Sequence, residues 1–91
     1  MSGYVAPLSE MRFVLRHLAG LPEVCALPPH RELGEELVFA VLAEAARFAQ
    51  EALAPLNASG DRDGARFHHG AVHAAPGYVE AYRAFAGAGW N

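Results

Sequence analysis

The chain has 91 residues, of which 53% are hydrophobic, with nine glycines and six prolines. This length allows one domain at most, and the apolar content excludes a disordered acidic or basic tail, because there is ample apolar surface to drive collapse. The formal net charge is −3, and the seven basic residues are arginines scattered along the chain. This distribution argues against a nucleic-acid-binding protein, which needs a concentrated basic face.

Cysteine content and the N-terminal sequence bear on the cellular compartment. The single cysteine, Cys25, excludes an internal disulfide, and we interpret it as a small apolar residue. The N-terminus has no basic region followed by an apolar core, so it does not read as a signal peptide. No uninterrupted apolar stretch approaches the roughly 20 residues that span a bilayer. We therefore expect a cytoplasmic protein without a membrane span.

The first predicted element is a short helix near the N-terminus. Its apolar residues at helical spacing are Leu8, Met11, Val14, Leu15 and Leu18. Ser9 is the expected N-cap of this helix, and Gly20 is expected to stop it.

A proline-rich connector follows over residues 22–36. Pro28 and Pro29 cannot lie inside a helix without the loss of backbone hydrogen bonds. We expect irregular structure here, with one helical turn around residues 22–27.

The dominant predicted element is a helix from residue 33 to about residue 57. Two adjacent apolar stripes run along it, namely Leu37, Val41, Ala45, Phe48 and Ala52, and Val38, Leu42, Ala49, Leu53 and Leu56. A face this wide needs neighbours on more than one side. Pro55 removes a backbone donor, so we expect a kink or a loose final turn there. Gly60 is the predicted stop.

Two smaller elements complete the pattern. Around residues 65–75, Phe67 and Val72 flank His69-Gly70, which predicts a small hairpin or flap with a tight turn at the glycine. A final helix presents Tyr78, Tyr82 and Phe85 on one face and should stop at Gly87 or Gly89. Trp90 follows so closely that we expect the natural chain to continue beyond it, because an exposed tryptophan is costly.

Residues that could carry chemistry are few. His68, His69 and His73 raise the possibility of a metal site, in which a strand would place His69 and His73 on one face and His68 on the other. A solvated turn is the favoured interpretation. Asp61 and Asp63 fail the calcium-loop pattern, because Ala65 and Val72 stand where that pattern needs ligands or a bidentate glutamate. We assign no catalytic, cofactor-binding or metal-binding residue within the chain.

Three motifs resemble one enzyme family. The stretch FAQEALAPLNASGDRDG resembles the first long helix and following turn of acyl-CoA dehydrogenases, through Phe48, Ala49, Glu51, Leu53, Ala54, Pro55, Leu56, Asn57, Gly60, Asp61, Arg62 and Gly64. The stretch PGYVEAYRAFAGAGW is similar to a motif of a subset of that family, through Pro76, Gly77, Tyr78, Glu80, Ala81, Tyr82, Arg83, Phe85, Gly89 and Trp90. The subset includes enzymes that act on 3-methylmercaptopropionyl-CoA.

The N-terminal stretch YVAPLSEMRFVL resembles the extra N-terminal segment of the same subset. The matching residues are Tyr4, Ala6, Pro7, Leu8, Met11, Arg12, Phe13, Val14 and Leu15. Ser9 and Glu10 depart from the Arg-Asp pair expected there. The resemblance thus covers nearly the whole chain, with three motifs in the expected order.

The resemblance implies an N-terminal part of an FAD-dependent acyl-CoA dehydrogenase, an enzyme of fatty-acid metabolism that oxidises an acyl-CoA thioester to the enoyl-CoA. It implies an N-terminal extension at 1–30 and, at 31–91, the start of a helical domain cut short at its C-terminal end. The FAD-binding segment and the catalytic base would lie beyond this chain, whose own role would be architectural. The implied partners are the remainder of the polypeptide, the acyl-CoA substrate, further copies of the parent enzyme and electron-transfer flavoprotein.

Two other hypotheses remain at this point. The chain could be a stand-alone helical interaction module that binds a partner through its apolar helix face. It could also be a small metal-binding domain built on the histidines.

Overall fold

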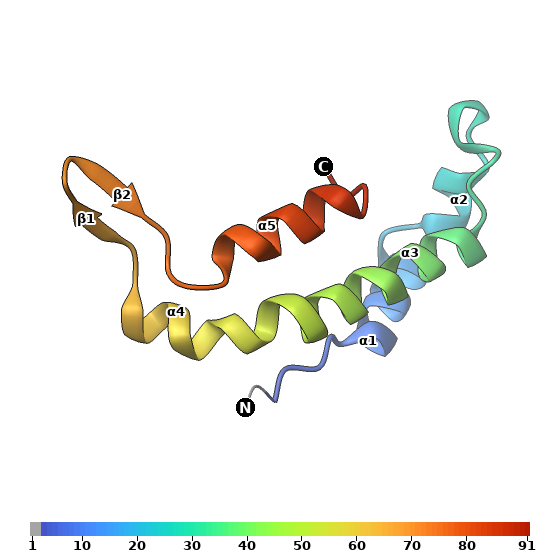
Figure 1. Cartoon of the computed structure of the whole chain (residues 1–91). Helices are drawn as coiled ribbons and strands as arrows, with labels where there is room; N and C mark the ends of the chain where they lie inside the picture. Colours follow the sequence, from blue (N-terminus) through green and yellow to red (C-terminus); the bar gives the residue numbers. More distant parts are fainter. Residues whose placement is uncertain (1–2) are drawn as a thin grey trace. The chain divides into compact units, whose positions relative to one another are not determined.

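The computed structural model describes residues 3–91 (Figure 1). Residues 1 and 2, which begin the extension predicted at 1–30, lie outside the described part. The described chain is mainly helical with one two-stranded hairpin, which confirms the predicted fold class. It divides into two compact units, one of residues 5–48 and one of residues 49–91 together with residues 3 and 4.

The unit of residues 5–48 consists of short helical segments and one longer helix. Its elements are α1 (Leu8–Phe13), the π-helical η1 (Val14–Leu18), α2 (Leu21–Cys25), the 3₁₀ turn η2 (Pro28–His30) and α3 (Glu35–Phe48). α1 and α2 both pack against α3. The core of this unit is thin, and its buried apolar residues are Ala6, Leu21, Phe39 and Ala46.

The first helix starts one residue earlier than the predicted cap. Pro7 is the N-cap, because its carbonyl oxygen already accepts the backbone N–H of Met11 at 3.0 Å. The prediction that Ser9 caps the helix was therefore wrong, since Ser9 lies within α1. The predicted stop is confirmed, because Gly20 has a φ of 72° and follows Ala19, the C-cap of η1.

In the connector, each of the two short helical elements has a proline in its first turn. α2 provides the helical turn expected around residues 22–27. Pro28 and Pro29 open the 3₁₀ turn η2, where a missing N–H removes no α-helical hydrogen bond. The longest helix, α3, then starts at Glu35, with Glu35 and Glu36 in a first turn that favours negative charge.

The unit of residues 49–91 consists of helical segments and a two-stranded hairpin. Its elements are the π-helical η3 (Ala49–Leu53), the 3₁₀ turn η4 (Ala54–Leu56), α4 (Asn57–Asp63), β1 (Arg66–His68), β2 (Ala71–His73) and α5 (Tyr78–Gly87). The buried apolar residues here are Ala54 and Ala75. Figure 1 shows the hairpin between α4 and α5 in chain order.

Pro55 changes the type of helix without ending the helical path. It lies in the first turn of η4, where no α-helical hydrogen bond is needed from its nitrogen. The preceding π turn and the 3₁₀ turn together accommodate the missing donor, and α4 then runs on to Asp63. The prediction that Gly60 stops the helix was wrong, because Gly60 lies inside α4 and Gly64 is the C-cap.

The hairpin predicted around residues 65–75 is confirmed. β1 and β2 pair antiparallel, with Phe67 opposite Val72. His69 and Gly70 form the two-residue turn with φ values of 50° and 76°, the left-handed pair of a type I′ turn. All residues of the two strands are exposed.

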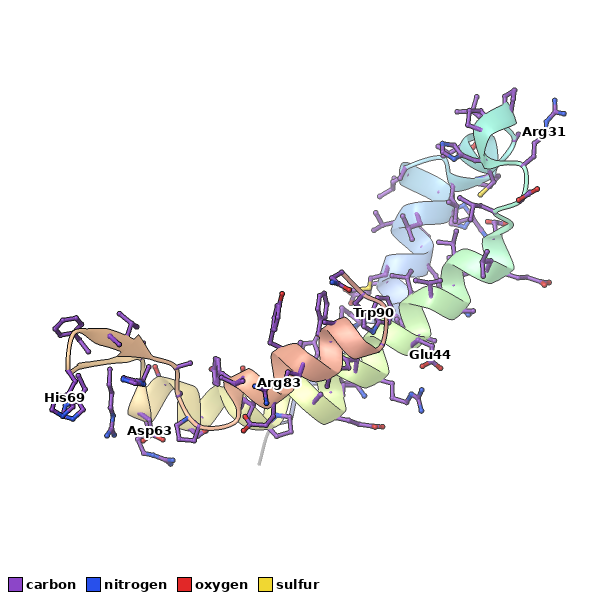
Figure 2. The ribbon with its side chains drawn as sticks, turned by 45° about the horizontal axis from the view of Figure 1, so that its top comes forward. Arg31, Glu44, Asp63, His69, Arg83 and Trp90 are labelled. Carbon is purple, nitrogen blue, oxygen red and sulfur yellow. The ribbon has the colours of Figure 1, made fainter. Side chains whose placement is uncertain are left out.

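The last helix ends at the glycines where the sequence predicted its end. α5 spans Tyr78–Gly87, and Gly89 has a φ of 88°. The N–H of Gly89 donates to Ala86 at 3.0 Å, and the N–H of Trp90 donates to Phe85 at 3.2 Å. These two bonds form a Schellman motif at the end of α5. Trp90 follows the left-handed glycine of this motif and is half-buried (Figure 2).

Candidate functional site

The unit of residues 49–91 carries an apolar groove of about 340 Å³. One side comes from η3 and η4, which contribute Leu53 and Leu56, and the other comes from α5. The lining residues are Leu53, Leu56, Asn57, Tyr78, Ala81, Tyr82 and Phe85. The three aromatic residues are the helix face expected from the sequence, and both leucines belong to one predicted apolar stripe. The groove therefore combines an apolar helix stripe and an aromatic helix face that are more than 20 residues apart in the sequence.

Two glycines set the approach of the segments that form this groove. A Cβ atom built on Gly60 would lie 2.7 Å from Cζ of Tyr78 and closer still to its hydroxyl oxygen. A Cβ atom built on Gly77 would lie 2.7 Å from Cδ2 of Leu56. Each glycine thus leaves room for a groove residue of the other segment. The sequence marks Gly60 only as a helix stop and Gly77 only as a position of a family motif, so their packing role was missed.

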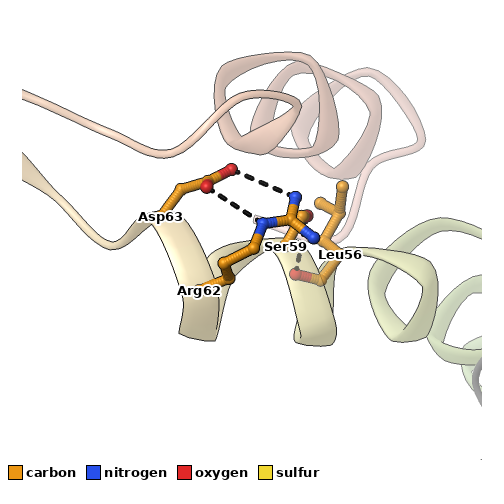
Figure 3. Close-up of polar contacts among 4 residues, drawn as sticks. All are labelled: Leu56, Ser59, Arg62 and Asp63. Atoms are coloured by element: carbon orange, nitrogen blue, oxygen red, sulfur yellow. Dashed lines mark hydrogen bonds and ion pairs between the residues drawn. The ribbon is translucent and has the colours of Figure 1, made fainter.

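The polar side-chain contacts of Ser59, Arg62 and Asp63 in α4 are all with neighbours close in the sequence. The hydroxyl of Ser59 donates to the carbonyl oxygen of Leu56 at 3.2 Å, one turn back (Figure 3). The guanidinium of Arg62 donates to both carboxylate oxygens of Asp63, at 3.2 Å from Nε and 3.4 Å from Nη2 (Figure 3). Asp61 and Asp63 both lie in this helix.

The unit of residues 5–48 carries a second apolar groove, of about 430 Å³. Its lining residues are Pro7, Glu10, Met11, Val14, Leu15 and Leu42. Glu10 is the one ionisable side chain among these six. Such a surface suits an apolar partner, because it offers almost no hydrogen-bonding groups to orient a polar ligand.

Beside this groove, two arginines stack on the largest buried side chain of the unit. The guanidinium carbons of Arg12 and Arg16 lie 4.8 and 5.5 Å from the ring centroid of Phe39. Arg16 also donates from Nε to Oε1 of Glu35 at 3.1 Å. Phe39 is only 8% exposed. These cation–π contacts and the ion pair fix α1 and η1 to the start of α3, which is a structural role.

The histidines form no built site. The register puts His68 and His73 on one face of the hairpin with Arg66, opposite Phe67 and Val72, while His69 occupies the turn (Figure 2). The predicted pairing of His69 with His73 on one face was therefore wrong, because the two-residue turn takes His69 out of the strand. Over residues 3–91, no group of three or more histidine, cysteine, aspartate or glutamate side chains could hold a metal ion.

Other candidate chemistry is equally limited. Cys25 is a free, half-buried cysteine at the end of α2. Within the described part of the chain, no helix combines the length and the apolar character that crossing a bilayer requires.

Comparison with known proteins identifies a relative. The chain is 39% identical over 88 residues to 3-methylmercaptopropionyl-CoA dehydrogenase of Ruegeria pomeroyi, an acyl-CoA dehydrogenase. The alignment covers 97% of this chain but only 15% of the relative. The resemblance to the acyl-CoA dehydrogenases that the three motifs indicated is confirmed. No protein-family model matches the chain, and no solved structure matches it.

Proposed function

We propose that this chain is the N-terminal portion of an FAD-dependent acyl-CoA dehydrogenase, which oxidises an acyl-CoA thioester to the α,β-unsaturated enoyl-CoA. The observation that carries the proposal is the 39% identity to an acyl-CoA dehydrogenase across 97% of the chain. The order of the three motifs supports it, since they follow one another from Tyr4 to Trp90 as expected for one continuous segment of such an enzyme.

Within that enzyme, the role of the chain is architectural. Large apolar side chains remain open to solvent on both units, including Leu37 and Val41 at 47% exposure each and Tyr82 at 67%. Apolar surface of this extent is costly to leave in water, so we expect another part of the protein to cover it. Further helices of the same polypeptide would cover the α3 stripes and the groove beside α5, and the long helical run would help to wall the acyl-binding cleft.

The two grooves do not fit FAD itself. A dinucleotide needs backbone N–H groups or cationic side chains at its pyrophosphate. The groove in residues 49–91 offers Asn57 and two tyrosines among apolar side chains, and the groove in residues 5–48 offers only Glu10 as an ionisable group, which is an acid. We propose that the flavin, and the catalytic base that the family resemblance implies, lie on parts of the enzyme outside these 91 residues.

The remaining parts of the proposal follow from the enzyme class. The partners would be the remainder of the polypeptide, the acyl-CoA substrate, other copies of the enzyme in a homo-oligomer and electron-transfer flavoprotein as electron acceptor. The enzyme would act in the cytoplasm, in the degradation of acyl thioesters.

The test is the intact mass of the natural gene product together with its visible absorbance spectrum. A mass several-fold above 9.7 kDa with bound flavin supports the proposal. A natural product of 9.7 kDa that binds no flavin would overturn it. In that case the exposed apolar side chains would favour the second candidate, a helical interaction module, which predicts self-association or partner capture in a crosslinking experiment.

A further inference from the structure

We draw no further inference here: the strongest candidate, the exposed apolar face that Phe67 and Val72 form on the β1–β2 hairpin, carries nothing because nothing in the structure shows what covers it.

Discussion

The phenol ring of Tyr78 lies against the backbone of Gly60, in the space that any side chain at position 60 would occupy. Gly60 is in the middle of α4, where a glycine destabilises a helix by about 1 kcal/mol relative to alanine. That cost is offset by the close approach of α5, which brings Tyr78, Tyr82 and Phe85 over Leu53 and Leu56 to form the groove. The contact between Gly60 and Tyr78 thus explains both an unfavourable helix residue and the apolar groove.

The substitution Gly60→Ala should destabilise the protein. A Cβ there would lie 2.7 Å from Cζ of Tyr78, so the tyrosine ring must move. We expect the free energy of unfolding to fall by about 1 kcal/mol, because the lost packing of the tyrosine ring outweighs alanine's better helix propensity. Urea-induced unfolding followed by circular dichroism measures this change.

The matched control is Gly87→Ala. Gly87 is the last residue of α5, and a Cβ built there meets nothing within 4 Å. This variant should be neutral or up to about 1 kcal/mol more stable. In a double-mutant cycle, Tyr78→Ala should remove most of the cost of Gly60→Ala. Equal effects of the two glycine substitutions would contradict the contact.

Gly77→Ala should be destabilising for two separable reasons. Gly77 has a φ of 92°, which alanine rarely adopts, and its Cβ would lie 2.7 Å from Cδ2 of Leu56. We expect a loss of about 1–3 kcal/mol in the free energy of unfolding. Combination with Leu56→Ala should recover only the steric part, because the backbone strain remains. Complete recovery in the same urea assay would show that the backbone is not strained.

Arg16 and Arg12 should differ in their sensitivity to salt. Both stack on Phe39, but Arg16 also pairs with Glu35, with 51% and 31% of the two side chains exposed. Arg16→Met should therefore cost about 0.5–1 kcal/mol at low salt and less at 1 M NaCl, because a partly exposed ion pair is screened. Arg12→Met should show a smaller salt dependence. Identical salt dependence of the two variants would argue against the ion pair.

The proposed covering of the groove predicts a position-specific effect on α5. Tyr82 lines the groove, whereas Val79 lies on the same helix outside it, and the two are 67% and 50% exposed in the chain by itself. If later helices cover the groove in the complete enzyme, Tyr82→Ser should lower its stability by about 2 kcal/mol and reduce its flavin content. Val79→Ser should change the stability by less than about 0.5 kcal/mol. An equally small effect of both substitutions would show that no later helix covers the groove.

Local patterns predicted most of the fold, because turn chemistry and helical periodicity are local. The His69-Gly70 turn, the left-handed ends at Gly20 and Gly89 and the aromatic face of α5 were all readable from neighbouring residues. The predictions that were wrong depended on contacts between residues distant in the sequence or on the exact register of the hairpin. Gly60 was predicted to end the helix because the sequence does not show that the side chain of Tyr78 packs against it. The hairpin register decided which histidines share a face.

The candidate site was predictable only in its parts. The leucine stripe and the aromatic face were both identified, but their union in one groove requires the reversal of the chain through the hairpin. The absence of assigned catalytic residues remains a prediction, since the proposed chemistry lies outside these residues. Family resemblance carried the functional proposal, because apolar grooves alone indicate a partner but not a reaction.

The most direct test of the central claim is an anaerobic titration of the purified natural gene product with acyl-CoA thioesters, followed by visible absorbance. The series should include 3-methylmercaptopropionyl-CoA and straight-chain acyl-CoAs of different lengths. The account predicts an oxidised flavin spectrum that bleaches on addition of at least one of these thioesters, with the matching enoyl-CoA as product. A gene product that binds no flavin, or a flavin that none of the thioesters reduces, would contradict it.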